Sequence, residues 1–371
     1  MTTPNEAKGP AGPADYERVL SGSDQNVASF EEAKSLIRRL QHFLHSNPTT
    51  IPLIVLLIGI IVFSIWVGGR FFAPFNLSLV LQQVTIIAIV GIAQTLVILT
   101  AGIDLSVGAI VVLSHVVMGK LAIDMGMPVA FAWLIGLLIG ILCGAFNGTL
   151  ISYFKLPPFI VTLGTWSVFG SLNLWYSQSQ TIRAQDIEAA APFLQFMGTP
   201  IGPHIALFGL SFNIGARFIL GSILMLLMAA FAWYALTRTA FGRHIYATGD
   251  DPEAARLAGI NTSRTLFAVY TIGGLICAIA GWVLIGRIGA VSPQAGGTLN
   301  IDSITAVVIG GTSLFGGRGS IAGTLFGALI VGVFRNGLQL AGVDVLWQEF
   351  AVGLLIIVAV AIDNWIRKAS A

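Results

Sequence analysis

Apolar residues occupy most of the chain in long runs, and short polar or glycine-rich stretches separate these runs. An α-helix needs about 20 predominantly apolar residues to cross the hydrocarbon core of a bilayer. The pattern therefore predicts roughly ten membrane-spanning helices, of which the eighth is short and interrupted by glycine. We expect the helices near residues 51–68, 77–100, 104–122, 129–151, 158–178, 216–236, 265–286, 302–316, 320–340 and 346–363.

Composition agrees with this pattern. Hydrophobic residues make up 56% of the chain, charged residues only 10%, and the mean hydropathy is +0.86. Soluble domains carry about 25% charged residues, so the expected fold class is an all-α, polytopic membrane protein with some discontinuous helices. The net charge of +2 and the lack of a dense basic run argue against a nucleic-acid partner. Cys143 and Cys277 lie in apolar runs, where we expect no disulfide.

The first 47 residues differ from the rest of the chain because they are rich in Gly, Pro, Ser and charge. Such a segment buries too little apolar surface to fold, and we predict a cytoplasmic, largely disordered tail at 1–47. Residues 48–371 form the predicted transmembrane domain. No small-residue cleavage site followed by a soluble sequence comes after the run at 51–68, so we expect this run to remain as an anchor.

Basic residues indicate the orientation, because lysine and arginine in short loops mark the cytoplasmic side of a membrane protein. They precede the first run and follow the last, at Lys8, Arg18, Lys34, Arg38, Arg39, Arg367 and Lys368. An even number of helices places both ends on one side, so the predicted topology is N-in and C-in. The loop 237–264 then faces the cytoplasm. The loop 179–215 faces outward, either as a cap over an outer cavity or as an ordinary surface loop.

The loop 237–264 concentrates charge that the rest of the chain avoids. Asp251 suits an N-cap, Pro252 the first helical position, and Gly259 the position after a helix end. These signals predict a helix of about seven residues, which is too short to be stable on its own. Something must therefore pack against this helix: either a second protein that docks there, or the membrane helices of the chain itself.

Four stretches of the chain form a recognisable set. They are "VILTAGIDLSVGAIVVLS" at 97–114, "LPPFIVTLGT" at 156–165, "TRTAFGRHIYATGDDPEAARLAGIN" at 237–261 and "AVVIGGTSLFGGRGSIAGTLFGALIVG" at 306–332. Together they resemble the sugar permease subunits of bacterial ABC importers of the ribose, xylose, arabinose and fructose type, which belong to the binding-protein-dependent transport permeases. The four stretches occur in the order expected for that family, and the resemblance extends over residues 77–363.

The resemblance implies a multi-pass protein of the bacterial inner membrane that translocates a monosaccharide, such as fructose or ribose, by alternating access. It implies three protein partners: a cytoplasmic ABC ATPase subunit, a periplasmic sugar-binding protein, and a second copy of the permease in a homodimer. In that family the EAA...G loop engages the ATPase. The candidate ATPase-coupling residues are Arg243, Gly249, Asp251, Glu253, Ala254, Ala255, Arg256 and Gly259.

Polar residues inside the predicted helices are candidates for the sugar path, since such groups usually face a cavity or one another. Asp104 either accepts hydrogen bonds from sugar hydroxyls or caps the helix that follows it, and Ser106 shares this ambiguity. The glycine-rich break at 310–323 serves either tight packing or the path. The same polar groups would also suit hydrogen bonds between helices. The candidate path residues are Asp104, Ser106, Asn147, Thr165, Trp166, Thr312, Ser313 and Asn336.

The sequence contains no recognisable catalytic set. The histidines are scattered without metal-ligand spacing, and "GGRG" lacks the spacing of a phosphate-binding loop. We expect no metal, no cofactor and no enzymatic activity, with ATP hydrolysis on a separate subunit. The alternative function is a stand-alone, ion-coupled secondary transporter of small polar solutes. This alternative is disfavoured because few carboxylates beyond Asp104 are expected deep in the membrane.

Overall fold

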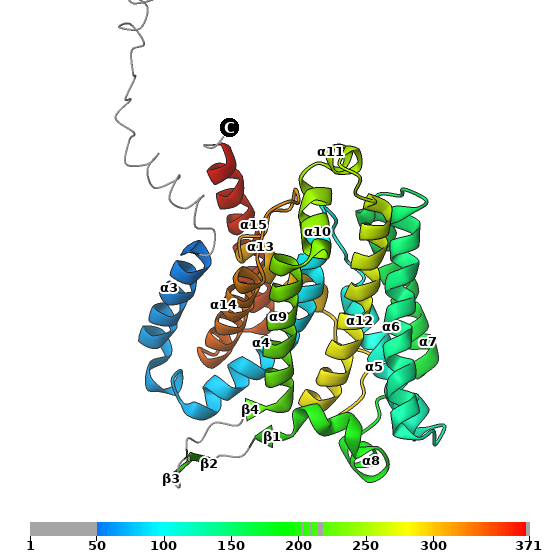
Figure 1. Cartoon of the computed structure of the whole chain (residues 1–371). Helices are drawn as coiled ribbons and strands as arrows, with labels where there is room; N and C mark the ends of the chain where they lie inside the picture. The colour runs from blue at the N-terminus through cyan, green and yellow to red at the C-terminus, as the bar shows by residue number, and fades with distance from the viewer. Residues whose placement is uncertain (1–49, 202–203, 208–209, 214–217, 369–371) are drawn as a thin grey trace, which may run out of the picture.

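The computed structural model describes residues 50–201, 204–207, 210–213 and 218–368, which form a bundle of long helices (Figure 1). The predicted tail at 1–47 lies outside the described residues. The long helices and the two shorter ones between them are α3 (Thr50–Val67), α4 (Pro74–Leu99), α5 (Val107–Ile123), α6 (Val129–Ser152), α7 (Pro158–Ser177), α9 (Leu220–Arg238), α12 (Thr262–Ile288), α13 (Leu299–Ile309), α14 (Ile321–Leu340) and α15 (Val345–Lys368).

Short elements occupy the two ends of the bundle. α10 (Ala240–Asp250) and α11 (Pro252–Leu257) lie at the end where α3 begins and α15 finishes (Figure 1). The strands pair antiparallel at the opposite end, β1 with β4 and β2 with β3, so that Pro200 faces Ile219 and His204 faces Asn213. The elements of that end are η1 (Gly68–Arg70), α8 (Ala184–Ala190), η2 (Pro192–Gly198), β1 (Pro200–Ile201), β2 (His204–Leu207), β3 (Leu210–Asn213) and β4 (Phe218–Ile219).

The predicted apolar runs all contain helices, so the class of an all-helical, multi-pass membrane protein is confirmed at that level. Among the described residues, 6 helices are long and apolar enough to cross a membrane: α3 with η1, α4, α6, α9, α12 and α14. α5 and α13 are shorter apolar helices. The count of about ten spans and the N-in, C-in topology remain predictions.

Two predicted helix boundaries differ from the structure. The run at 104–122 becomes helical only at Val107, and the run at 302–316 leaves the helix after Ile309. In both places a non-helical connection replaces the expected helix, at 100–106 and at 310–320. Each connection contains a backbone angle that a helix excludes, with φ of +60° at Ala101 and of +83° at Gly311. The predicted discontinuity of the eighth run therefore lies after its short helix.

One order of elements occurs twice in the described chain. A long helix, a non-helical connection, a short helix and two further helices appear as α4 to α7 and again as α12 to α15. Each long helix packs against the short helix of the other set, and α4 and α12 pack against each other. α4 ends beside α10, whereas α12 ends beside the α8 end of the bundle, so the two sets run in opposite directions. Inverted repeats of this kind are common among transporters.

α4 and α12 form the centre of the bundle. In an apolar stretch of 18 residues in each helix, 67% of the residues of α4 and 72% of those of α12 are buried, against 28% for α3 and 28% for α6. A helix that is apolar on all sides and buried is typical of a protein interior or a membrane span. The exposed apolar faces of α3 and α6 are then the surfaces that contact lipid or another subunit.

Glycines bring α6 and α12 into backbone contact. A Cβ atom added at Gly144 would lie 2.3 Å from the Tyr270 carbonyl oxygen, and one added at Gly274 would lie 2.1 Å from the Gly140 carbonyl oxygen. Such distances are far shorter than any normal contact. Small residues at this spacing allow membrane helices to approach closely, and van der Waals packing then holds the helices together.

We expect Gly274→Ala to separate α6 from α12 and to destabilise the protein by about 1–3 kcal/mol, because the added methyl group overpacks the contact. The apparent melting temperature in detergent measures this change. Gly273→Ala is the matched control, since its added Cβ would meet only the Ala93 Cβ atom at 3.9 Å. Equal melting temperatures for the two variants would contradict the close approach of the helices.

Candidate functional site

The charged loop forms two short helices with well-defined starts. Thr239 precedes α10, and its hydroxyl oxygen accepts a hydrogen bond from the Gly242 N–H at 3.3 Å. Asp251 precedes α11, and its Oδ1 accepts from the N–H groups of Glu253 and Ala254 at 2.8 and 3.0 Å. Gly259 follows α11 with φ of +85°. The predicted Asp251 cap and Gly259 stop are therefore present in the structure.

The sequence prediction missed α10, because it placed a single helix in this loop. The signal that identifies α10 is the spacing of its buried residues, Gly242, Ile245, Thr248 and Gly249, which follows a helical repeat. Three of these residues are polar or lack a side chain, so the sequence shows no apolar stripe here. α10 packs against α9, α12 and α4, and α11 packs against α10 and α12.

The candidate coupling residues divide into two groups. Gly249 and Ala255 are buried within the chain and do not reach the surface. The exposed group consists of Arg243, Asp251, Glu253, Ala254, Arg256 and Gly259. Leu257, which the prediction did not include, has 91% of its surface exposed, the largest fraction among the exposed large hydrophobic residues of the described chain.

The inner face of α11 is held by the chain itself. Ala255 is buried, and the Arg256 Nε donates a hydrogen bond to the Thr262 hydroxyl at 3.1 Å, which joins α11 to the start of α12. The outer face carries Glu253, Ala254 and Leu257 without burial. The loop is thus packed on the bundle on one side, as one sequence interpretation expects, and exposed on the other, where docking of a second protein stays a prediction.

A second group of polar residues lies inside the bundle, where the chain leaves α4 and enters α5. The Asp104 Oδ1 accepts from the Ser106 N–H at 2.8 Å and from the Ser106 hydroxyl at 2.6 Å. The Asn147 Nδ2 donates to the Ser106 Oγ at 2.8 Å, and the Gln94 side-chain amide donates to the Asp104 carbonyl. All four residues are buried. Asp104 thereby satisfies the N–H of Ser106, the residue directly before α5, in an Asx turn, while the structure shows no side-chain cap on α5 itself.

Three buried oxygens in this region make no hydrogen bond within the described part of the chain: Gln94 Oε1, Asn147 Oδ1 and the Tyr270 hydroxyl. The Tyr270 hydroxyl is close to the break, since a Cβ atom added at Gly102 would lie 2.6 Å from it. Buried polar atoms cost about 1–3 kcal/mol each when no partner is present. The break is therefore a described region in which two acceptors and a hydroxyl remain available for a polar solute.

The structure does not bring the other path candidates to this group. The Asn336 and Asn76 amides donate to each other's oxygens at 2.9 and 3.0 Å, which ties α14 to α4. Thr312 and Ser313 are buried in the connection after α13. Thr165 is buried on α7, whereas Trp166 keeps 45% of its surface exposed. Only Asp104, Ser106 and Asn147 among the eight candidates form one contiguous set.

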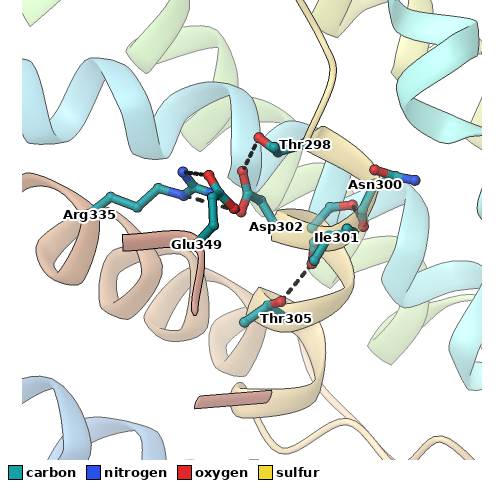
Figure 2. A network of polar contacts seen from close by, with 8 residues as sticks. Thr298, Asn300, Ile301, Asp302, Thr305, Arg335 and Glu349 are labelled. Carbon is teal, nitrogen blue, oxygen red and sulfur yellow. Dashed lines mark hydrogen bonds and ion pairs between the residues drawn. The ribbon is translucent and has the colours of Figure 1, made fainter. Parts of the chain in front are cut away.

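An ion-pair network joins the last three helices (Figure 2). The Arg335 guanidinium on α14 donates to the Asp302 Oδ1 on α13 at 2.7 Å and to the Glu349 Oε1 on α15 at 2.7 Å. The Thr298 hydroxyl donates to the second Asp302 oxygen at 3.0 Å. The Asp302 side chain is 5% exposed and Arg335 is 19% exposed, while Glu349 is 39% exposed.

The sequence prediction did not identify this network. In the sequence, Asp302, Arg335 and Glu349 are isolated charged residues within or beside apolar runs. Their pairing cannot be read from the sequence, because they lie on three different helices. Asp302 lies within α13 and Glu349 within α15, and the expectation of few carboxylates deep in the membrane stays a prediction. Both are bound to Arg335, and a buried charge is tolerated when it is paired in this way.

We expect Arg335→Gln to destabilise the protein by about 3–5 kcal/mol, because it leaves the buried Asp302 carboxylate without its cation. Thermal unfolding in detergent measures the loss. Arg264→Gln serves as the matched control, since Arg264 is exposed in the first turn of α12, and surface substitutions usually change stability by no more than about 0.5 kcal/mol. A melting temperature for Arg335→Gln as high as that of the control would show that the network does not hold the three helices.

A multi-pass bundle of apolar helices, with buried polar groups at a helix break and a charged projection at one end, is the architecture of a membrane transport permease. The profile of the family described as "Branched-chain amino acid transport system / permease component" matches residues 76–360, and the chain belongs to this family. No solved structure matches the chain with significance.

Curated relatives are sugar permeases. The chain is 58% identical over 359 residues to the fructose import permease of Rhizobium meliloti, covering 96% of this chain and 97% of the relative. It is 39% identical over 320 residues to the ribose import permease of Bacillus subtilis, covering 86% and 93%. It is 33% identical over 368 residues to the xylose transport system permease of Escherichia coli K12, covering 87% and 94%.

The chain is therefore a permease subunit of a sugar ABC importer, as the four sequence stretches indicated. It is a multi-pass protein of the bacterial inner membrane. Its relatives are permease subunits and not enzymes themselves. The rival interpretation as an ion-coupled secondary transporter is set aside, because the relatives are import permeases and the carboxylates found within the helices are already bound, Asp302 to Arg335 and Asp104 to Ser106.

Proposed function

We propose that the chain is the fructose-translocating permease of an ATP-driven, binding-protein-dependent importer. The identity of 58% to a fructose import permease, against 39% and 33% to ribose and xylose permeases, supports fructose over the pentoses. Two copies of the chain form one path, a periplasmic sugar-binding protein delivers the sugar, and separate ATPase subunits hydrolyse ATP. The family resemblance supports these partners.

The α10–α11 end of the bundle faces the cytoplasm in this proposal. Basic residues flank both ends of the chain at this end, which supports that assignment. The α8 and β-strand end then faces the binding protein. Both termini and the loop 237–264 thus share one side, as the N-in, C-in prediction requires.

The ATPase docks on the outer face of α11. The single observation that carries this assignment is a six-residue helix, capped at Asp251 and anchored by Ala255, whose outer face stays open at Glu253, Ala254 and Leu257. Leu257 supplies the apolar anchor that interface centres use, and the charges of Glu253 and Arg256 surround it as a polar rim. Arg243, Asp251 and Gly259 complete the exposed surface, while Ala255 supports α11 from inside and Gly249 lies buried on α10, outside this surface.

The sugar passes along the break before α5. Asn147 Oδ1 and Gln94 Oε1 accept hydrogen bonds from sugar hydroxyls, and the Tyr270 hydroxyl is available as a donor or acceptor. Asp104 and Ser106 hold the backbone of the break in place. Thr165, Trp166, Thr312, Ser313 and Asn336 stay predictions of the path with less support, since they lie apart from this group. The bundle opens alternately to the two sides because ATP and sugar bind the two states with different affinity.

Transport in proteoliposomes tests the function. With the ATPase and the binding protein present, we expect uptake of labelled fructose to require ATP and to persist when an ionophore collapses ion gradients. Uptake of ribose and xylose under the same conditions should be lower. Uptake that continues without ATP but stops with the ionophore would overturn the importer assignment. A preference for ribose would overturn only the proposal that fructose is the substrate.

We expect Leu257→Asp to weaken binding of the ATPase subunit by about 2 kcal/mol or more, because it removes a central apolar anchor and buries a charge. Co-purification and titration of the ATPase onto the detergent-solubilised permease measure this affinity. Met125→Asp is the control, since Met125 is 65% exposed in the turn after α5, at the other end of the bundle. Unchanged ATPase affinity in the Leu257 variant would refute docking on α11.

A further inference from the structure

The inner side of α10 contacts the end of α4 and the connection after α13. A Cβ atom added at Gly249 would lie 1.8 Å from the Leu99 carbonyl oxygen and 2.9 Å from the Gly317 nitrogen. The Gly317 N–H in turn donates to the Leu99 carbonyl at 3.0 Å. The last residue of α4, the end of α10 and the connection after α13 therefore meet through backbone atoms. We call Leu99, Gly249, Gly316 and Gly317 the glycine junction.

Two further contacts reinforce the glycine junction. A Cβ atom added at Gly316 would lie 2.5 Å from the Gly249 carbonyl oxygen, and the φ of +85° at Gly316 suits glycine alone without strain. The Tyr246 hydroxyl on α10 donates to the Gly319 carbonyl at 2.8 Å. Burial raises the pKa of Tyr246, so the phenol stays protonated and remains a donor at physiological pH.

The two segments held by the glycine junction lead to the short helices. Residues 100–106 begin one position after Leu99 and contain Asp104 and Ser106, which position the start of α5. Residues 310–320 follow α13 directly and precede α14. α10 is thus in contact with Leu99, the residue directly before the break at which the proposed sugar path lies, and with the connection beside the other short helix. Neither contact passes through a flexible side chain.

We infer that α10 transmits the movement of the docked ATPase to the 100–106 and 310–320 segments through the glycine junction, with Gly249 and Tyr246 as positioning residues. This inference rests on the proposed docking of the ATPase on α11. Backbone atoms in contact leave no space to absorb a displacement, since protein interiors are close-packed and transmit strain. A shift of α10 therefore moves both segments together, whereas a contact through long side chains would dissipate it.

Gly249→Ala tests the junction. The methyl group has to displace α10 from Leu99, so we expect sugar uptake per ATP hydrolysed to fall by about tenfold, within the usual range of a coupling free energy. The affinity for the ATPase subunit should stay at the wild-type value, because Gly249 is buried away from the docking surface. Gly164→Ala is the matched control, since no atom lies within 4 Å of a Cβ added at Gly164 on α7.

Tyr246→Phe tests the same inference with a milder change that keeps the ring packing. Loss of one hydrogen bond corresponds to about a fivefold decrease in uptake per ATP, with the melting temperature lowered by no more than about 4 °C. Tyr153→Phe is the control, because Tyr153 is 55% exposed. All measurements use the full permease with its ATPase and binding protein in proteoliposomes.

The outcomes separate the inference from the proposed function. Wild-type uptake per ATP in both the Gly249 and the Tyr246 variants would overturn transmission through the glycine junction. A parallel loss of ATPase affinity in both variants would also overturn it, since the junction would then only support the docking surface. Unchanged ATPase affinity in Leu257→Asp would show, independently of these variants, that the ATPase does not dock on α11.

Discussion

A bilayer interior offers no water to backbone amides, so each break in a membrane helix must find its hydrogen-bond partners inside the protein. This constraint governs residues 100–106 and 310–320, where the chain leaves the helical conformation. Asp104 satisfies the Ser106 N–H before α5, and the Ser320 hydroxyl accepts from the Gly323 N–H at the start of α14. Both breaks are stable because neighbouring helices of the bundle surround them. Polar side chains gather near the first break because its backbone needs hydrogen-bond partners.

Features with local signals could be predicted from the sequence. The apolar runs located the helices, and Asp251 with Gly259 bracketed α11, because caps and apolar runs depend on neighbouring residues alone. α10 could not be predicted in the same way, since Gly249 is buried by Leu99, a residue about 150 positions earlier. The path candidates show the same limit: residue type indicates that a buried amide needs a partner, but Asn336 finds it at Asn76 and not near Asn147.

Polar contacts join each short helix to its own set of helices. Asn147 on α6 holds Ser106 at the start of α5, while Arg335 on α14 and Glu349 on α15 hold Asp302 on α13. Contacts between the two sets include apolar side chains of α4 and α12, closely packed glycines, and the amide pair of Asn76 on α4 with Asn336 on α14. A movement of one set against the other would therefore leave the Arg335 ion pairs and the Asn147–Ser106 hydrogen bond intact. It would change the packing contacts, which carry little directional preference, and the Asn76–Asn336 pair.

A contact made by backbone atoms has an evolutionary consequence. At the glycine junction no side chain can be exchanged for another of similar shape, so almost any substitution at Gly249 alters the contact itself. In the proposed sugar path, the polar contacts come instead from side chains such as Asn147 and Gln94, which can change without touching Leu99 or Gly317. The residues that would contact the sugar are therefore separate from those that would couple transport to ATP. The same coupling contacts can then serve permeases that diverge to carry fructose, ribose or xylose.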